Sequence, residues 1–198
     1  MALTLIKEDG TGKPDANSYA DVTDGDGYHD GHLYATAWTG ATADRKAAAL
    51  VMATRLIDSQ FQFNGGRTSA AQALQWPRTE CPDPDKGLLA VSVLLPILSD
   101  FVDYNAVPSA VVQATCEMAR ELLVVDRTAS PPGEGLDSVQ TIHATHAASG
   151  TGSSSDTSAT KYSKVDTRPI ISHVAQAMLA KFGALMCGSS GMVRLTRA

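Results

Sequence analysis

Residues 43–61 of this chain of 198 residues read ADRKAAALVMATRLIDSQF and give its clearest structural signal. Asp44 stands near the start, where a carboxylate stabilises the partial positive charge of a helix N-terminus. Small and apolar residues recur at three- and four-residue spacing, at Ala47, Leu50, Val51, Thr54, Ile57 and Phe61. This period predicts a long helix that packs along one face and ends at Gly65-Gly66.

Two more helices are predicted on the C-terminal side of this segment. Residues 107–123, VPSAVVQATCEMARELL, place Pro108 at a first helical position and again repeat apolar residues every three or four positions. We expect this helix to end near Asp126. A last helix is predicted from Pro169 to Leu185 on the same grounds.

Weaker signals predict two further helices. Ser18 followed by Asp21 is a capping pattern for a helix that runs through to Leu33. Gly25 and Gly27 disfavour this helix by about 1 kcal/mol each relative to Ala.

A second capping pattern, Ser69 with Gln72, predicts a short helix that stops before Trp76-Pro77. The apolar run 88–107 fits either a buried strand or a short helix, and a helix is favoured after Pro96.

Residues 139–145 change to an alternating pattern typical of a strand. The Ser/Gly/Thr-rich segment 149–160 has little apolar area to bury, so a mobile hairpin tip or linker is expected there. The predicted fold is mainly α, a helical bundle with an extended β-hairpin-like arm and a C-terminal tail. Its parts are a core at 1–137, the arm at 138–165, a last helix packed on the core at 166–187 and a tail at 188–198.

Composition and charge limit the classes of function that this chain can have. Charged residues make up 19% and the formal net charge is -5, whereas proteins that grip phosphates usually show a basic stripe. Three widely separated cysteines give neither a disulfide framework nor a Cys-x-x-Cys motif, so reduced thiols in the cytosol are expected. The N-terminus shows no signal peptide, and no apolar run is long enough to cross a membrane.

Motif tests argue against an enzyme, a cofactor or a bound metal. The segment EDGTGKP resembles a phosphate loop, but Lys7 and Pro14 occupy positions where that motif needs Gly and Ser or Thr. An EF-hand counted from Asp24 would need Gly at His29 and Glu at Ala35. The pairs His29/His32 and His143/His146 have no further ligands in a recognisable zinc pattern, and no catalytic signature is found.

The triplet Trp76, Pro77 and Arg78 is the most distinctive local feature. Pro77 fixes the backbone, and Trp76 offers a large apolar face. Arg78 offers a rigid set of hydrogen-bond donors. One interpretation is a core anchor beside a surface arginine. The other is an anchor between subunits, because Trp and Arg are enriched at interface hot spots.

The order of these segments resembles a family found in phage genomes, the head-to-tail adaptor proteins of tailed bacteriophages. The likeness rests on NSY at 17–19, the ALVMATRLID helix, LQWPR at 74–78 and the helix that begins VPSAVV. Members of the family are often labelled DnaT-like single-stranded-DNA-binding proteins. The run before Val107 and the Ser/Gly-rich segment are longer than the family pattern, which leaves loop lengths open.

The resemblance implies a virion protein without enzymatic activity. It would form a ring of about twelve copies beneath the portal, at the neck, after assembly in the host cytoplasm. Its expected partners are its own copies, the portal protein, a stopper or tail-terminator protein, and genomic double-stranded DNA that passes without specific binding. No membrane is involved. The residues expected to dock on the portal are Met192, Val193, Arg194, Leu195, Thr196, Arg197 and Ala198.

Two alternatives remain. The first is a single-stranded-DNA-binding protein of phage replication, against which stand the acidic balance and 6% aromatic content. The second is a small phage enzyme or regulatory factor, but no group of residues in the sequence supports it.

Overall fold

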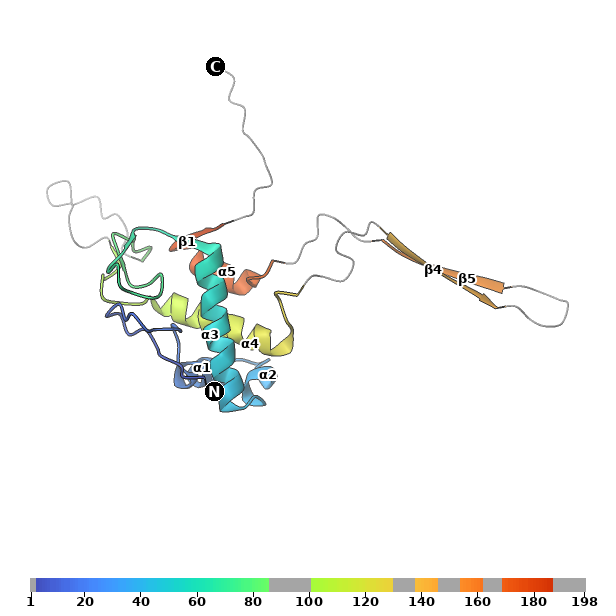
Figure 1. The fold of residues 1–198 in the computed structure, drawn as a ribbon, viewed down its shortest axis with the longest axis horizontal. Helices are drawn as coiled ribbons and strands as arrows, with labels where there is room; N and C mark the ends of the chain where they lie inside the picture. Colours follow the sequence, from blue (N-terminus) through green and yellow to red (C-terminus); the bar gives the residue numbers. More distant parts are fainter. Residues whose placement is uncertain (1–2, 86–100, 130–137, 146–153, 162–168, 187–198) are drawn as a thin grey trace, which may run out of the picture. The chain divides into compact units, whose positions relative to one another are not determined.

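The computed structural model describes residues 3–85, 101–129, 138–145, 154–161 and 169–186, in two compact units (Figure 1). The first unit comprises Met1–Arg127 and Ile171–Ala198, and the second comprises Thr128–Ile170. The described chain is largely helical, with a few short antiparallel strands. None of the helices described is long and apolar enough to span a membrane.

Helices α3 (Ala43–Gln60) and α4 (Ser109–Val124) form the centre of the first unit and pack against each other (Figure 1). Leu50 and Ile57 of α3 and Val111 and Met118 of α4 are fully buried at this centre. Burying a side chain of this size stabilises the fold by about 1.5–3 kcal/mol. The predictions of two long helices at these positions are confirmed.

Helices α1 (Val22–Asp30) and α2 (Thr36–Thr39) pack on α4 as well. The prediction of a helix here is confirmed, but its cap and its end differ. The cap is Asp21, whose carboxylate accepts a hydrogen bond from the Asp24 amide, while Asp24 accepts one from the Asp21 amide. Ser18 instead donates its hydroxyl to the carbonyl of Ala20, because it is buried before the helix starts.

The end of α3 turns directly into strand β1 (Phe61–Phe63), so Phe61 is not helical as expected. Phe61 and Phe63 both point to the core and stack at 5.7 Å. β1 pairs antiparallel with β6 (Gly183–Leu185), with Phe61 opposite Leu185. A side chain at Gly183 would lie 2.3 Å from the Gln62 carbonyl oxygen, so this pairing requires a glycine there.

The predicted last helix is shorter than expected. Helix α5 (His173–Leu179) is capped by Ser172, and the chain then turns into β6 instead of continuing to Leu185. Pairing with β1 satisfies the backbone there and places Phe182 in the core. α5 packs on α4.

The predicted short helix after Ser69 is absent, and residues 69–75 form turns. The Gln72 side chain does accept a hydrogen bond from the Ser69 amide, but its Nε2 donates to the carbonyls of Leu74 and Pro77. These bonds hold a compact loop instead of a helix. Strands β2 (Gly66–Arg67) and β3 (Arg78–Thr79) pair antiparallel on either side of it.

In the second unit, β4 (Ser138–Thr145) pairs antiparallel with β5 (Ser154–Lys161) along eight residues. The predicted strand is confirmed, and it forms a hairpin-like pair with β5. That the pair forms an extended arm stays a prediction. The expectation that 149–160 is only a tip or linker is wrong in part, since residues from Ser154 onward form β5. Ladder hydrogen bonds between the two strands satisfy their backbone groups whatever the side chains are. Of the apolar run 88–107, residues 88–100 lie outside the described residues. Residues 101–107 are described and form no helix, so the helix favoured after Pro96 does not extend into them.

Candidate nucleic-acid interface

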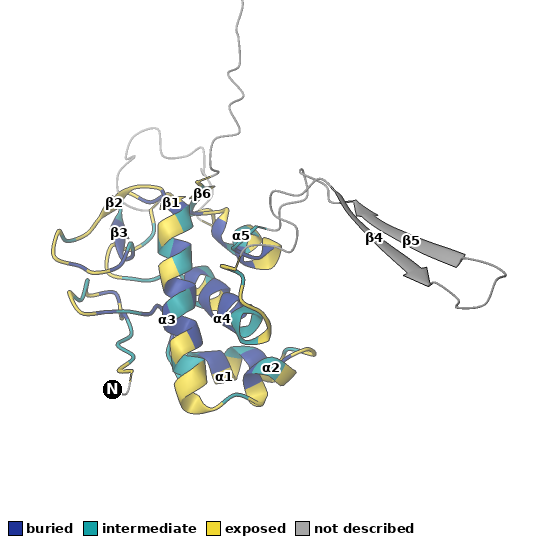
Figure 2. Ribbon diagram, turned by 45° about the vertical axis from the view of Figure 1, so that its right-hand side comes forward, coloured by how far each residue is buried: buried dark blue, intermediate teal, exposed yellow. Residues whose placement is uncertain are grey.

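One face of α3 is turned away from the core and remains exposed (Figure 2). At 100° per residue, positions 45, 48, 52, 55 and 59 fall on a single stripe of this face. Arg45 and Arg55 on this stripe are both exposed. Ten residues separate them, which is about 15 Å along the helix axis.

Arg45 and Arg55 are unusual among the described cations because their guanidinium groups have no partner. Most other basic side chains form ion pairs, such as Lys46 with Asp26 at 2.7 Å and Lys13 with Asp9 at 2.8 Å. Arg78 donates instead to backbone carbonyls, including that of Asn64 at 2.8 Å. Among the described residues, the exposed guanidinium groups that have no partner are thus those of Arg45 and Arg55, and both lie on α3.

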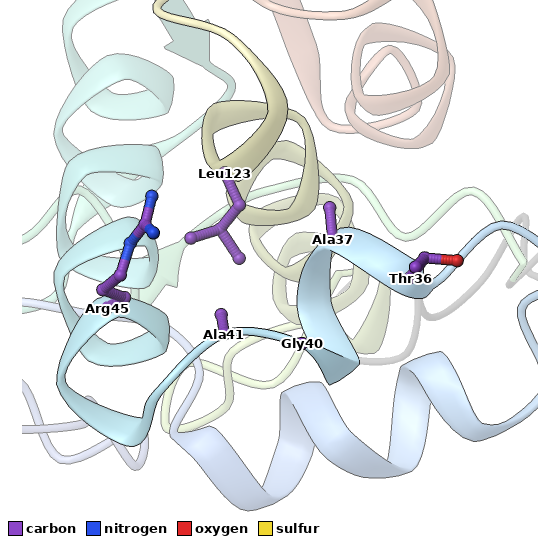
Figure 3. A pocket seen from close by; sticks show the side chains of 6 residues that line it. All are labelled: Thr36, Ala37, Gly40, Ala41, Arg45 and Leu123. Atoms are coloured by element: carbon purple, nitrogen blue, oxygen red, sulfur yellow. The ribbon is translucent and has the colours of Figure 1, made fainter.

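A hollow of about 200 Å³ adjoins Arg45, between α2, the start of α3 and the end of α4 (Figure 3). Its wall comprises Ala37, Ala41 and Leu123, with Thr36 and Gly40 from the α2 segment. Leu123 reaches down between Arg45 and Ala37 in Figure 3. A wall of small aliphatic side chains and polar atoms, with one guanidinium at the rim, suits a ligand that has a flat ring beside an anionic group.

An exposed aromatic residue comes just before the hollow-lining residues in the sequence. Tyr34 is 76% exposed and lies two residues before Thr36. Its amide donates to Nδ1 of His32 at 3.0 Å, and Nε2 of His32 lies 3.7 Å from Glu117 of α4. The loop is thus tied to α4 while the Tyr34 ring faces solvent, as a base-stacking side chain requires.

The loop that resembles a phosphate loop is already occupied by its own carboxylate. Glu8 is buried, and its oxygens accept hydrogen bonds from the amides of Gly10, Gly12 and Lys13 at 2.8–2.9 Å. These are the backbone donors that would otherwise surround a phosphate. The loop therefore stabilises the fold through its own buried carboxylate.

The acidic run in α1 is bound into the fold in a similar way. Asp24 accepts the Asp21 amide and pairs with Lys7 at 2.5 Å. Asp26 accepts from Nε1 of Trp38 at 2.8 Å and from Lys46 at 2.7 Å. These carboxylates point to different partners, so they do not form one ligand set.

His29 is buried next to α4 and its Nε2 lies 3.2 Å from the Cys116 carbonyl oxygen. Burial lowers the pKa of His29, since it disfavours the charged ring. Burial also raises the pKa of the Cys116 thiol to about 12, which keeps it protonated. That the protein is not an enzyme nevertheless stays a prediction.

Trp76 and Arg78 lie inside the unit and Pro77 lies between them. Trp76 is fully buried and contacts the rings of Phe63 and Phe182. Arg78 is 7% exposed, and its donors meet the carbonyls of Phe63 and Gly65 as well as the Asn64 carbonyl. The triplet therefore anchors the core of its own chain, with a buried arginine where a surface one was expected. A contact with another subunit stays a prediction.

The predicted docking residues Met192–Ala198 lie outside the described part of the chain. Sequence reasoning also missed Arg45, Arg55 and Tyr34. Spacing alone would have paired Arg55 with Asp58 three residues later. In the structure Asp58 turns inward to Tyr19 instead, at 2.5 Å.

Comparison with known proteins corrects the predicted function. A family model described as "Putative DnaT-like ssDNA binding protein" matches residues 3–198. Neither a comparison with curated proteins nor one with solved structures gives a match. The match names a single-stranded-DNA-binding family and no connector, so the assignment as a head-to-tail adaptor is wrong. The predicted ring of copies beneath the portal is therefore wrong as well. The same holds for the predicted partners, which were the portal protein, a tail protein and passing double-stranded DNA.

The location in the virion neck depended on that adaptor assignment and stays an untested expectation. The matched region covers nearly the whole chain, including both described units. The chain belongs to the DnaT-like single-stranded-DNA-binding family.

Proposed function

We propose that this protein binds single-stranded DNA on the exposed face of α3, with Arg45 at the centre of the site. The observation that carries the proposal is the free guanidinium of Arg45 at the rim of the hollow beside Leu123. The description of the family supports the same ligand. The net charge of -5 disfavours long-range attraction to DNA, so the proposed binding depends on the local charge of Arg45 and Arg55.

Arg45 and Arg55 contact phosphates of one strand in this proposal. Their separation of about 15 Å along α3 suits non-adjacent phosphates of an extended strand. An unpaired base enters the hollow against Leu123, and Tyr34 stacks on a neighbouring base. A duplex hides the faces of its bases in the stack, so the site favours single strands.

We also infer that α1, α3, α4 and α5 form a helical bundle that holds this face rigid. The contacts of α4 with each of the other three helices support that inference.

The test is the fluorescence anisotropy of a labelled oligo-dT strand at several salt concentrations. Two neutralised phosphates give a slope of log affinity against log salt of about -1.4, from about -0.7 per phosphate on a single strand. The double variant Arg45→Ala/Arg55→Ala is expected to bind more weakly and with a slope near zero.

The matched control is Lys13→Ala/Lys181→Ala, which removes the same charge from side chains paired with Asp9 and Asp85. It should retain both the affinity and the slope. Equal losses in the two double variants would mean that only overall charge matters and would overturn the site. Preference for a duplex of the same length would overturn the choice of ligand.

A further inference from the structure

A second cavity lies between α1 and the N-terminal half of α4, apart from the α3 face. Its volume is about 430 Å³, within the range of small-molecule sites. Ser109, Val112, Gln113 and Cys116 line it from α4 at helical spacing. Tyr28 of α1 lines it from the other side.

The charged groups of this cavity are already satisfied by one another. Lys7 lies 2.5 Å from Asp24 and 3.7 Å from Asp21. Asp24 also accepts the Asp21 amide. Lys7 is shared by two aspartates, so no free cation is left for an anionic ligand. Both carboxylates already accept hydrogen bonds from a backbone amide as well.

The neutral polar groups of the cavity, by contrast, are unused. Within the described chain no hydrogen bond is formed by the hydroxyls of Tyr28 and Ser109 or by the side-chain amide of Gln113. Together they offer donors and acceptors at several points of the wall. Val107 and Val112 add apolar surface between them.

We propose that this cavity binds a nucleobase in a neutral nucleoside. A base is planar, carries donors and acceptors on its edge, and has apolar faces. Its edge meets Gln113 and the two hydroxyls, and its faces lie against Val112 and the Tyr28 ring. This site is separate from the proposed DNA site, and neither depends on the other.

Titration of ¹⁵N-labelled protein with thymidine and with adenosine tests the proposal by NMR. Saturable shifts are expected at amides of residues 109–116 and around Tyr28. Gln113→Leu should weaken binding about five-fold, as for the loss of one hydrogen bond of about 1 kcal/mol. Adenosine monophosphate should bind more weakly than adenosine, because its phosphate gains no free cation.

Two variants make the result decisive. Val112→Trp fills the cavity and should abolish nucleoside binding, whereas Val124→Trp, on an exposed position of the same helix, should not. The Arg45→Ala/Arg55→Ala protein should still bind nucleosides. Absence of saturable shifts, unchanged binding by Val112→Trp, or loss of binding in the α3 variant would each overturn the proposal.

Discussion

The hydroxyl of Tyr19 donates a hydrogen bond to Oδ1 of Asp58 at 2.5 Å. The same hydroxyl oxygen accepts from the amides of Gln75 and Trp76, at 3.0 and 3.2 Å. Oδ2 of Asp58 accepts from the Gln75 amide as well, at 3.0 Å. Three segments far apart in sequence, NSY, α3 and LQWPR, are thereby joined at one buried point.

Replacement of Tyr19 by Phe is expected to destabilise the fold by about 2–3 kcal/mol. The change removes a buried donor and acceptor and leaves Asp58 and the Trp76 amide without their partner, and each such loss costs about 1–3 kcal/mol. Urea denaturation followed by circular dichroism measures the effect. Tyr104→Phe is the control, because Tyr104 is 64% exposed and should change stability by less than about 0.5 kcal/mol.

Asp58 is expected to make stability depend on pH. Burial raises its pKa to about 6, against the hydrogen bonds from Tyr19 and Gln75, which lower it. The folded pKa lies above the unfolded value of about 3.9, so the folded state binds more protons between these values. This contribution is therefore fully present below about pH 4 and is lost as the pH rises through about 6.

The expected size of that loss is about 2–3 kcal/mol for a shift of about two pKa units. Other carboxylates titrate too, and ion pairs lower the pKa of Asp26, which acts in the opposite direction. The change between pH 4 and pH 7 is therefore compared between the wild type and Asp58→Asn. A difference of less than about 0.5 kcal/mol between the two changes contradicts the role of Asp58.

Gly25→Ala and Gly27→Ala form a matched pair on α1. A Cβ at Gly25 would lie 2.3 Å from the Trp38 ring, whereas one at Gly27 meets nothing within 4 Å. We expect Gly25→Ala to destabilise the protein by about 1–3 kcal/mol through overpacking. Gly27→Ala should stabilise it by about 0.5–1 kcal/mol, the helix propensity of alanine over glycine. Thermal denaturation of both variants checks the opposite signs.

Leu123→Trp tests the contribution of the hollow to DNA binding separately from the contribution of the charged groups. The indole fills the space beside Arg45 without removing a cation. DNA affinity should fall, while the salt slope should stay near the wild-type value because the phosphate contacts remain. Val174→Trp, at a half-exposed position of α5, controls for an added aromatic ring. An unchanged affinity for Leu123→Trp means that no base enters the hollow.

Helices α3 and α4 follow from periodicity alone, because an apolar repeat of three and four residues can be buried only on one side of a helix. The β4 strand likewise follows from its alternation, and Asp44 lies in the first turn of α3. These signals are local. The sequences of residues 43–61, 107–123 and 139–145 are each enough to predict their own helix or strand, without the rest of the chain.

Contacts between distant residues decided the remainder. Pairing with β1 ends the last helix early, since Phe182 gains a place in the core that a continued helix does not offer. The charges show the same dependence: Asp58 bonds Tyr19, thirty-nine residues away, instead of Arg55 on its own helix. Which cations remain free to meet a strand of DNA is thus set by tertiary packing, because burial and pairing of charges depend on neighbours that only the folded chain brings together.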